Sequence, residues 1–329
     1  MGEIQTQDAA SIPQASSCTG KVVIVGAGAV GSTFAYAMQL RGAARQIVLI
    51  DRNRELAEAE ASDLSHGALF APPVEITAGD YPDCADADLV AICAGSAQKP
   101  GQSRMELVST NVGICKTIVR QVVEHTSKAT ILIVTNPVDV LTYAAIKYSG
   151  LPTNQVIGSG TVLDSARLRY MLSRHCRVDA RNIHGYVLGE HGDSEMVAWS
   201  AVTIGGMAIG KYCPACPRHC PPLEQEQLAA QVRDSAYHII EAKGATNYAV
   251  GQAMTHIATA ILRNENSVLT VSTLLNGEYG LHDVCLSVPV IINRSGVERI
   301  LNLQLTEPEL QALQASAEAI KNVQREVGL

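Results

Sequence analysis

The sequence lacks the features that would place it among membrane, secreted or nucleic-acid-binding proteins. No apolar run approaches the roughly 18 residues of a membrane-spanning helix. Positive charge is also in deficit, because 25 Lys and Arg residues face 32 Asp and Glu residues and the formal net charge at pH 7 is −7. We therefore expect no membrane span, and neither a nucleic acid nor an anionic membrane surface as a partner. An anionic small substrate would need local arginines.

The opening residues lack a secretory signal as well. Residues 1–19 contain neither a basic segment nor an apolar core, so we expect them to form a flexible arm that is not cleaved. Six of the nine cysteines are scattered, several of them in apolar contexts where a thiol behaves as a small hydrophobic group. The pattern fits a reducing cytoplasm rather than a disulfide framework.

The remaining cysteines cluster in the segment CPACPRHC, which holds Cys213, Cys216, His219 and Cys220. These are the ligand types of a zinc site. Structural zinc sites, however, usually draw their ligand pairs from two separated segments, and the flanking prolines indicate an exposed loop. Surface thiols or a local disulfide are therefore the favoured interpretations, with zinc as the alternative, and we predict no metal.

The segment KVVIVGAGAVGSTFAYAMQLRG predicts a strand, a glycine turn and a helix. In that context G-x-G-x-x-G is a dinucleotide-binding pattern: Gly26 makes the turn, Gly28 lets the backbone approach a pyrophosphate, and Gly31 permits close packing of helix on strand. The N–H groups at the start of the helix then face the phosphates. We predict that Gly26, Gly28, Val30 and Gly31 bind a dinucleotide, the alternative being a purely structural glycine turn.

A second predicted strand, QIVLID, ends at Asp51, 20 residues after Gly31. An acidic side chain at this place accepts hydrogen bonds from the ribose hydroxyls of an adenosine. Because it also repels a 2′-phosphate, NAD is expected as the cofactor rather than NADP. Arg52 and Arg54 follow directly and could weaken that preference, although a solvated turn also explains them.

Strands and helices alternate further along the chain. Apolar runs occur at ADLVAICAG and KATILIVTNP, with a helix predicted over 108–125 between them. This alternation predicts an α/β fold with a Rossmann, doubly wound parallel sheet. At 329 residues the chain is long enough for two domains, and we expect a NAD-binding Rossmann domain over 20–145 and an α+β substrate-binding, catalytic domain over 146–329. Ligands bind beyond the carboxyl ends of such strands, where GSAQKPGQSR and TNPVD lie.

A set of reactive side chains follows in the second half. In VLDSARLRYML, Asp164 and Arg167 are three positions apart and share a helix face that Arg169 does not. In IHGYVLGEHGDSE, a predicted strand runs into a glycine-flanked turn that presents His191. Taken singly, these could be a helix-end acid, a surface cation and a turn residue. Beside a nicotinamide, they could move a proton and grip a carboxylate.

From Lys21 to the C-terminus the chain resembles the L-lactate and malate dehydrogenase family. The resemblance rests on six blocks that occur in family order: GAGAVGS, QKPGQSR, TNPVD, VLDSARLR, GEHGDSE and KGATNY. It implies that His191 is the general acid and base, that Asp164 orients the imidazole and favours its protonated form, and that Arg167 grips a substrate carboxylate with two parallel hydrogen bonds.

The resemblance also gives the loop after ADLVAICAG a role. Arg104 would swing in on that loop to polarise the reacting carbonyl, and the loop would be a lid that closes over bound substrate. Gly95 is expected at a hinge and at the cofactor. Asn136 would hydrogen-bond near the carbonyl and contact the cofactor, and Thr246 would line the substrate pocket.

Gln98 is the residue at which the resemblance places substrate choice. An arginine there would pair with the second carboxylate of oxaloacetate, whereas a neutral Gln98 leaves that charge buried without a partner. We therefore expect pyruvate and L-lactate as substrate and product, the final step of lactic fermentation. The alternatives are malate dehydrogenase activity and a non-catalytic NAD-binding protein of the same fold.

Arg169 and His184, seven residues before His191, match positions that bind fructose 1,6-bisphosphate across a subunit interface in bacterial members of the family. The resemblance thus implies an allosteric, bisphosphate-activated homotetramer with a four-cation pocket. An ordinary interface salt bridge is the alternative.

Overall fold

The computed structural model describes residues 20–96, 101–209 and 224–329. Residues 1–19, Gln98 and the CPACPRHC segment lie outside the described residues. The helices are α1 Ala29–Arg41, α2 Arg54–His66, α3 Arg104–His125, α4 Val138–Ser149, α5 Val162–Cys176, α6 Gln225–Lys243, α7 Tyr248–Leu262 and α8 Glu307–Glu326. The longer strands are β1 Lys21–Val25, β2 Gln46–Ile50, β3 Glu75–Ala78, β4 Leu89–Ile92, β5 Thr130–Ile133, β6 Val156–Gly158, β12 Ser267–Asn276, β13 His282–Asn293 and β14 Gly296–Ile300.

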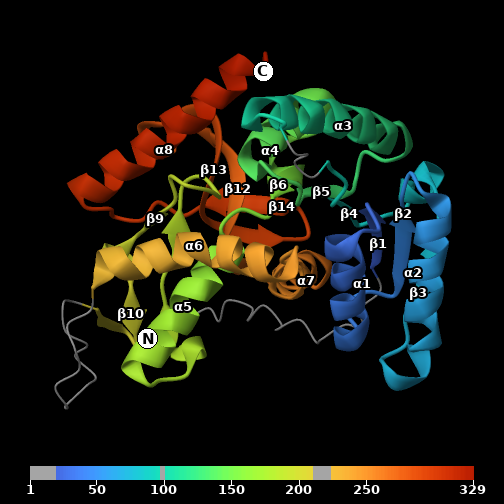
Figure 1. Ribbon diagram of the computed structural model, residues 1–329, viewed down its shortest axis with the longest axis horizontal. Helices are drawn as coiled ribbons and strands as arrows, with labels where there is room; N and C mark the ends of the chain where they lie inside the picture. The colour runs from blue at the N-terminus through green and yellow to red at the C-terminus, as the bar shows by residue number, and fades with distance from the viewer. Residues whose placement is uncertain (1–19, 97–100, 210–223) are drawn as a thin grey trace, which may run out of the picture.

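Nine strands form one sheet in the order β14-β13-β12-β6-β5-β4-β1-β2-β3. The six strands from β6 to β3 are parallel, and their order is that of a doubly wound dinucleotide-binding sheet. This confirms the predicted α/β class. Helices α3 and α4 lie on one side of these strands and α1 and α7 on the other (Figure 1).

The parallel sheet continues into antiparallel strands of the second half of the chain. β12 pairs antiparallel with β6 through Ser272 and Gly158, and β13 and β14 extend the sheet further. The expected boundary at 145/146 falls within α4. Short strands β7 Ile183–His184 and β8 Val187–Leu188 then lead toward the histidine turn, whose Gly189 bridges to Ser287 of β13. The second half therefore builds directly on the edge of the first.

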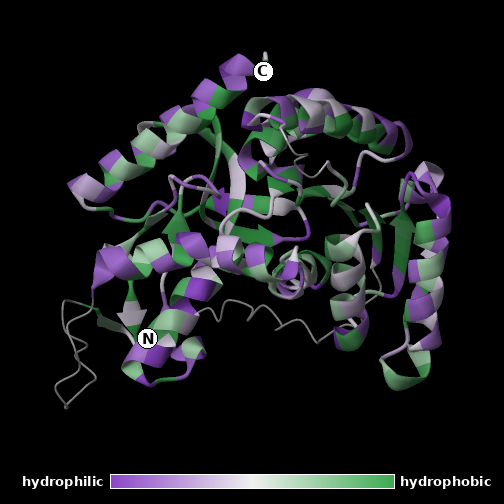
Figure 2. Cartoon of the chain, viewed as in Figure 1, coloured by the Kyte–Doolittle hydropathy of each residue, from purple (hydrophilic) through white to green (hydrophobic). Residues whose placement is uncertain are grey.

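The parallel strands are mostly apolar because both faces of the sheet are buried. β4 and β5 are buried along their whole lengths, as expected for strands covered by helices on both sides. Figure 2 shows apolar residues concentrated in the strands and polar ones on the outer faces of the helices. None of the helices in the described part of the chain combines the length and apolar character of a bilayer span. The rigid sheet fixes the ends of its strands, where the site residues follow.

Helix α3 begins earlier than the predicted start at residue 108. The Ser103 hydroxyl accepts from the Glu106 backbone nitrogen and the Glu106 carboxylate accepts from the Ser103 backbone nitrogen, so the pair forms a capping box. Arg104 is consequently the first residue of a helix and not a loop residue. Polar composition concealed this start, because Ser103 and Glu106 stabilise a helix end without supplying apolar periodicity.

Candidate active site

The glycine turn lies where β1 passes into α1. Gly26 has a φ of +107°, and a Cβ built on it would lie 2.5 Å from the Ala94 nitrogen, so a side chain is excluded by both conformation and space. Gly28 is the N-cap of α1, and apart from its chain neighbours and its own helix no described atom lies within 4 Å of a Cβ built on it. The start of α1 is thus open for a ligand to approach its N–H groups.

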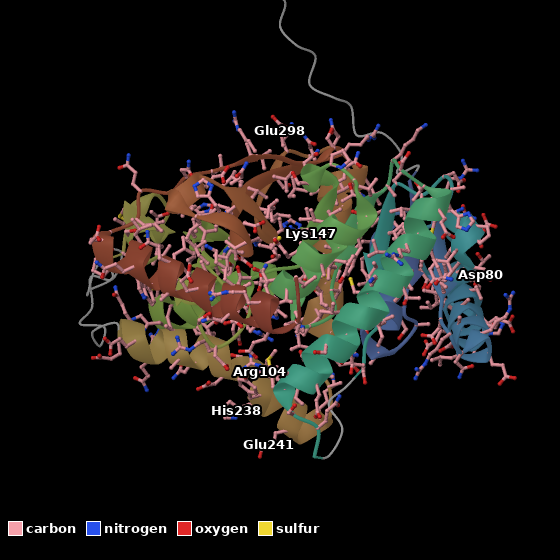
Figure 3. The ribbon with its side chains drawn as sticks, turned by 90° about the horizontal axis from the view of Figure 1, so that it is seen from above. Asp80, Arg104, Lys147, His238, Glu241 and Glu298 are labelled. Carbon is pink, nitrogen blue, oxygen red and sulfur yellow. The ribbon has the colours of Figure 1, made fainter. Side chains whose placement is uncertain are left out.

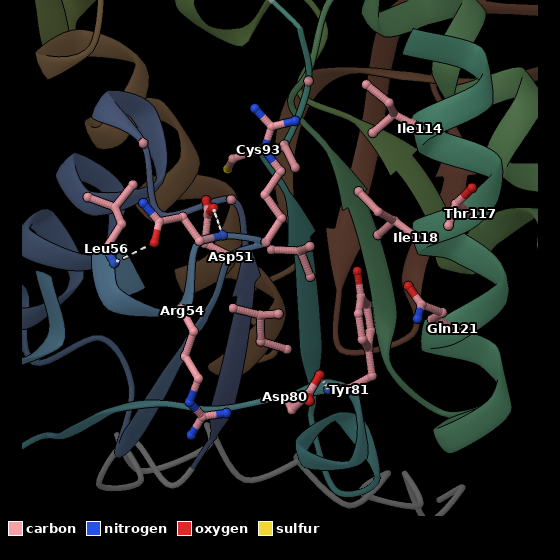
Figure 4. A pocket seen from close by; sticks show the side chains of 18 of the residues that line it. Asp51, Arg54, Leu56, Asp80, Tyr81, Cys93, Ile114, Thr117, Ile118 and Gln121 are labelled. Atoms are coloured by element: carbon pink, nitrogen blue, oxygen red, sulfur yellow. Dashed lines mark hydrogen bonds between the residues drawn. The ribbon is translucent and has the colours of Figure 1, made fainter. Parts of the chain in front are cut away.

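Asp51 follows β2 and faces this turn. Its Oδ2 accepts from the Ala27 nitrogen and its Oδ1 from the Asn53 nitrogen, both at 2.9 Å. Asp51, Gly26, Gly28 and Gly95 line one cavity of about 1010 Å³ (Figure 4). The glycine cradle and the carboxylate thus sit at a single site, and the set fits a dinucleotide with its phosphates at α1 and a ribose at Asp51. Val30 and Gly31 lie in the first turn of α1, next to that lining.

Sequence reasoning missed part of the cavity wall. Ile114 and Ile118 come from α3 on the opposite side of the cavity from Asp51, and Tyr81 lies below them (Figure 4). The two isoleucines are one helical turn apart, so their spacing was a usable signal for a shared face. Tyr81 belongs to a short 3-10 helix for which no motif gave a signal. These apolar groups suit the flat face of an adenine.

Asp164 lies between His191 and Arg167. The Asp164 Oδ2 is 2.6 Å from His191 Nδ1, and Arg167 Nη1 donates to Asp164 Oδ1 at 2.7 Å. Asp164 is 2% exposed, whereas the His191 side chain retains 24% exposure. The contact of Nδ1 with Asp164 leaves Nε2 as the nitrogen that can exchange a proton with a substrate.

The ionisation of this group follows from its contacts. Burial would lower the pKa of His191, but the charge and hydrogen bond of Asp164 outweigh it and raise the pKa to about 9. Burial would raise the pKa of Asp164, yet His191 and Arg167 hold it below its usual range. Each Asp164 oxygen already faces one N–H partner, so the arrangement suits a proton and an anion better than a metal ion.

A second buried acid, Asp139, holds the backbone of His191 in place. Asp139 Oδ2 accepts from the His191 backbone nitrogen at 2.8 Å, and Oδ1 accepts from Ser272 Oγ at 2.6 Å. Burial raises the pKa of Asp139 to about 6 despite these two hydrogen bonds. Asp139 belongs to the TNPVD motif, but its role was not predicted because the contact joins residues 52 positions apart.

Arg104 contacts the same turn that carries His191. Its Nη1 lies 3.2 Å from Asp193 Oδ2 and its Nη2 lies 3.8 Å from Glu190 Oε1, while 69% of its side chain is exposed. Tyr237 of α6 donates to the other Asp193 oxygen at 2.9 Å. Figure 3 shows Arg104 at the end of α3, beside α6. The guanidinium therefore lies beside the turn that carries His191 and is paired with the exposed Asp193 and the largely buried Glu190.

The other predicted site residues are more scattered. Asn136 is exposed at the end of a cis peptide bond to Pro137, and its carbonyl accepts from Asn111 Nδ2 at 2.9 Å. Thr246 is partly buried between α6 and α7.

Arg169 and His184, the predicted allosteric pair, differ in their surroundings. Arg169 donates to the Ala180 carbonyl at 3.3 Å and lines a separate cavity of about 530 Å³, whereas His184 is exposed on β7. No hydrogen bond among the described residues joins Arg169 to His184.

Comparison with known proteins gives likenesses over nearly the whole chain. The family model "lactate/malate dehydrogenase, NAD binding domain" matches residues 20–158, and "lactate/malate dehydrogenase, alpha/beta C-terminal domain" matches 161–327. An L-lactate dehydrogenase of Treponema denticola is 52% identical over 303 residues, and one of Acetivibrio thermocellus is 50% identical over 303 residues; each match covers 92% of this chain and 96% of the relative.

Solved structures agree with these relatives. MGS-M5, a lactate dehydrogenase from a Medee basin deep-sea metagenome library, superposes with a TM-score of 0.92 at 43% identity, covering 94% of this chain and 99% of that one. The minor L-lactate dehydrogenase of Enterococcus mundtii, in a ligand-bound form, gives a TM-score of 0.90 at 44% identity, covering 94% and 98%.

Proposed function

The chain belongs to the lactate/malate dehydrogenase family, and from this premise we propose that it interconverts pyruvate and L-lactate. It is an NAD-dependent oxidoreductase of that family. The observation that carries the proposal is the position of one buried carboxylate, Asp164, between an imidazole and a guanidinium. Such a cluster combines a proton donor with a cation for a substrate carboxylate.

His191 acts as the general acid. When bound, the reduced nicotinamide supplies hydride to the keto carbon. The protonated imidazole donates the Nε2 proton to the keto oxygen, which becomes the hydroxyl of L-lactate. Asp164 keeps the imidazole oriented through Nδ1 and stabilises its positive charge. In the reverse direction neutral His191 takes the hydroxyl proton back.

Arg167 and Arg104 are proposed as the two cations for the substrate. Arg167 is held by Asp164 at 2.7 Å and retains donors for the planar carboxylate of pyruvate. Arg104, paired with Asp193 in the structure, exchanges this surface partner for the substrate's keto oxygen when the preceding loop closes, and polarises it where negative charge develops. Asn136 adds a hydrogen bond near that oxygen, and Thr246 lines the pocket.

Cofactor binding is assigned to the glycine turn and Asp51. The N–H groups at the start of α1 hold the pyrophosphate, Gly26, Gly28, Val30 and Gly31 give the backbone close access, and Gly95 and Asn136 border the nicotinamide half. Asp51 accepts from the adenosine ribose and excludes a 2′-phosphate. The shared cavity of Gly28, Gly95 and Asp51 supports this assignment.

Substrate choice is assigned to Gln98. In the closed, dehydrated site the second carboxylate of oxaloacetate would be buried without a cation. The desolvation of such an unpaired charge costs on the order of several kcal/mol. Pyruvate presents a methyl group there instead. Relatives of about 50% identity that are named L-lactate dehydrogenase support the same choice.

We further propose a homotetramer in the cytoplasm, activated by fructose 1,6-bisphosphate through Arg169 and His184. Buried thiols such as Cys84, Cys115 and Cys285 suit a reducing compartment. We retain the division into an arm over 1–19, a NAD-binding domain over 20–145 and a catalytic domain over 146–329 as part of the proposal.

Initial rates of NADH oxidation test the function. We expect kcat/KM for pyruvate to exceed that for oxaloacetate by at least about 100-fold, the scale set by one unpaired buried charge. A preference for oxaloacetate would indicate malate dehydrogenase activity, and turnover of neither would indicate a non-catalytic protein. Activation is tested by measuring the rate as a function of pyruvate concentration with and without fructose 1,6-bisphosphate, from pH 5.5 to 7.5. If the two saturation curves are the same, the proposed activation is contradicted.

A further inference from the structure

A third acid, Glu195, stands beside the catalytic pair and has no role in the mechanism above. Its side chain is buried, with 6% of the residue exposed, and its Oε1 has no hydrogen-bond partner among the described residues. One oxygen of Glu195, one of Asp164 and one ring nitrogen of His191 all lie within 4.8 Å of one another. A buried carboxylate oxygen without a donor is costly if it is charged.

The groups around Glu195 come from three elements. Asp164 and Arg167 face it from α5, His191 from its own turn, and Arg233 from α6. Burial, and then the negative charge of Asp164, raise the pKa of Glu195 to about 8, while the three cationic groups oppose this. The cations do not bring the pKa of Glu195 back to its ordinary value, because two of them, Arg167 and His191, already pair with Asp164.

Counting charges shows what a neutral Glu195 achieves. Asp164, Arg167 and protonated His191 sum to one positive charge, and Arg104 adds another when it reaches the substrate. An ionised Glu195 would make this set one unit more negative, with the added charge beside Asp164 and within 4.8 Å of His191. A buried negative charge so close to the site opposes the binding of an anionic keto acid.

We propose that Glu195 is a positioning residue that binds its proton together with His191 and thereby keeps the site positively charged for the keto acid. This inference rests on the proposed function. Both protons are required for pyruvate to bind productively, so loss of either one removes the form of the enzyme that turns pyruvate over. The ionisation of Glu195 sets an upper pH limit on pyruvate binding in addition to the limit set by His191 itself. Because the two groups interact, they titrate as a pair.

The test compares the wild-type protein with Glu195→Gln, which has nearly the same shape and cannot ionise. At alkaline pH we expect log kcat/KM for pyruvate to fall with a limiting slope near −2 in the wild type and near −1 in Glu195→Gln. Each pH unit then lowers the wild-type value about 100-fold and that of the variant about tenfold. The matched control is Glu241→Gln on the exposed face of α6, which should keep the wild-type slope.

A binding measurement on the wild type tests the inference even if Glu195→Gln does not fold. Oxamate has the charge and shape of pyruvate but is not reduced. We expect its binding to the NADH complex near pH 9.5 to take up close to two protons, measured by calorimetry in buffers of different ionisation enthalpy. Uptake of one proton, or equal slopes near −1 for wild type and Glu195→Gln, overturns the inference alone. Absence of pyruvate turnover at every pH instead refutes the proposed function.

Discussion

Replacing Asp164 with Asn removes the charge that sustains a protonated His191. Asp164 Oδ2 lies 2.6 Å from Nδ1, and the pKa of His191 is raised from 6.5 to about 9 chiefly because Asp164 outweighs the opposing effect of burial. At about 1.4 kcal/mol per tenfold change in proton affinity, this preference for the protonated form amounts to about 3 kcal/mol. In Asp164→Asn only the smaller effects of Asp139 and Glu195 still oppose burial, so we expect the pKa to fall to about 6.5 or below.

The expected loss of activity follows from the protonated fraction. At pH 7.5 an imidazole with a pKa near 9 is about 97% protonated, whereas one with a pKa near 6.5 is about 10% protonated. Protonation alone therefore predicts about a tenfold loss of kcat/KM for pyruvate, and disturbed orientation of the imidazole and Arg167 adds to it. The assay is kcat/KM against pH from 5 to 10, with exposed Asp179→Asn as the matched control.

The alkaline limit is the decisive observation. If Asp164→Asn loses activity but keeps the wild-type alkaline limit, Asp164 does not control the ionisation of His191 and the reasoning is refuted. Stability supplies a second readout. Because the folded pKa of His191 lies above its ordinary 6.5, the pairing stabilises the protein fully below pH 6.5 and is lost as pH rises through about 9. The free energy of unfolding of Asp164→Asn should depend less on pH across that window.

Three further substitutions test the assigned roles. Arg167→Lys should raise KM for pyruvate about tenfold to 100-fold, because a lysine cannot form two parallel hydrogen bonds to a carboxylate; an unchanged KM would contradict the assignment. Arg104→Gln should lower kcat about 100-fold with a smaller effect on KM, since its charge is needed in the transition state; stopped-flow measurement of NADH oxidation would separate chemistry from product release. Asp51→Ser should reduce the preference for NADH over NADPH at least about tenfold by removing repulsion of the 2′-phosphate, as measured by the ratio of kcat/KM for the two cofactors.

The fold was predictable because its signals are local. The glycine turn, the run of β-branched residues before it and the acid after the second strand all belong to one strand-helix-strand unit, and each has a direct physical reason to be there. The start of α3 was less accessible, because the capping box of Ser103 and Glu106 lies in polar sequence that also reads as loop. The antiparallel pairing of β12 with β6 joins segments more than 100 residues apart, and no local pattern encodes it.

In the candidate site, too, the local contacts were predictable from sequence and the long-range contacts were not. Asp164 and Arg167 share a helix face, so their contact could be expected from spacing alone, and their meeting with His191 was suggested by the family resemblance. The contacts of Asp139 with His191 and Ser272 depend on three separate elements. The pairing of Asp193 with both Arg104 and Tyr237 likewise depends on how α3 and α6 meet the histidine turn. Such contacts follow from packing and are not written in the spacing of any one motif.

Three buried acids around one histidine differ in pKa because their partners differ. Asp164 has two cationic partners, which overcome burial and keep it ionised. Asp139 has only a hydroxyl and a backbone N–H, so burial raises its pKa to about 6. Glu195 has an oxygen with no donor and a negative neighbour, and its pKa rises furthest, to about 8. Asp164 thus stays ionised and stabilises the proton on His191. Near neutral pH Glu195 is uncharged and does not repel an anionic substrate.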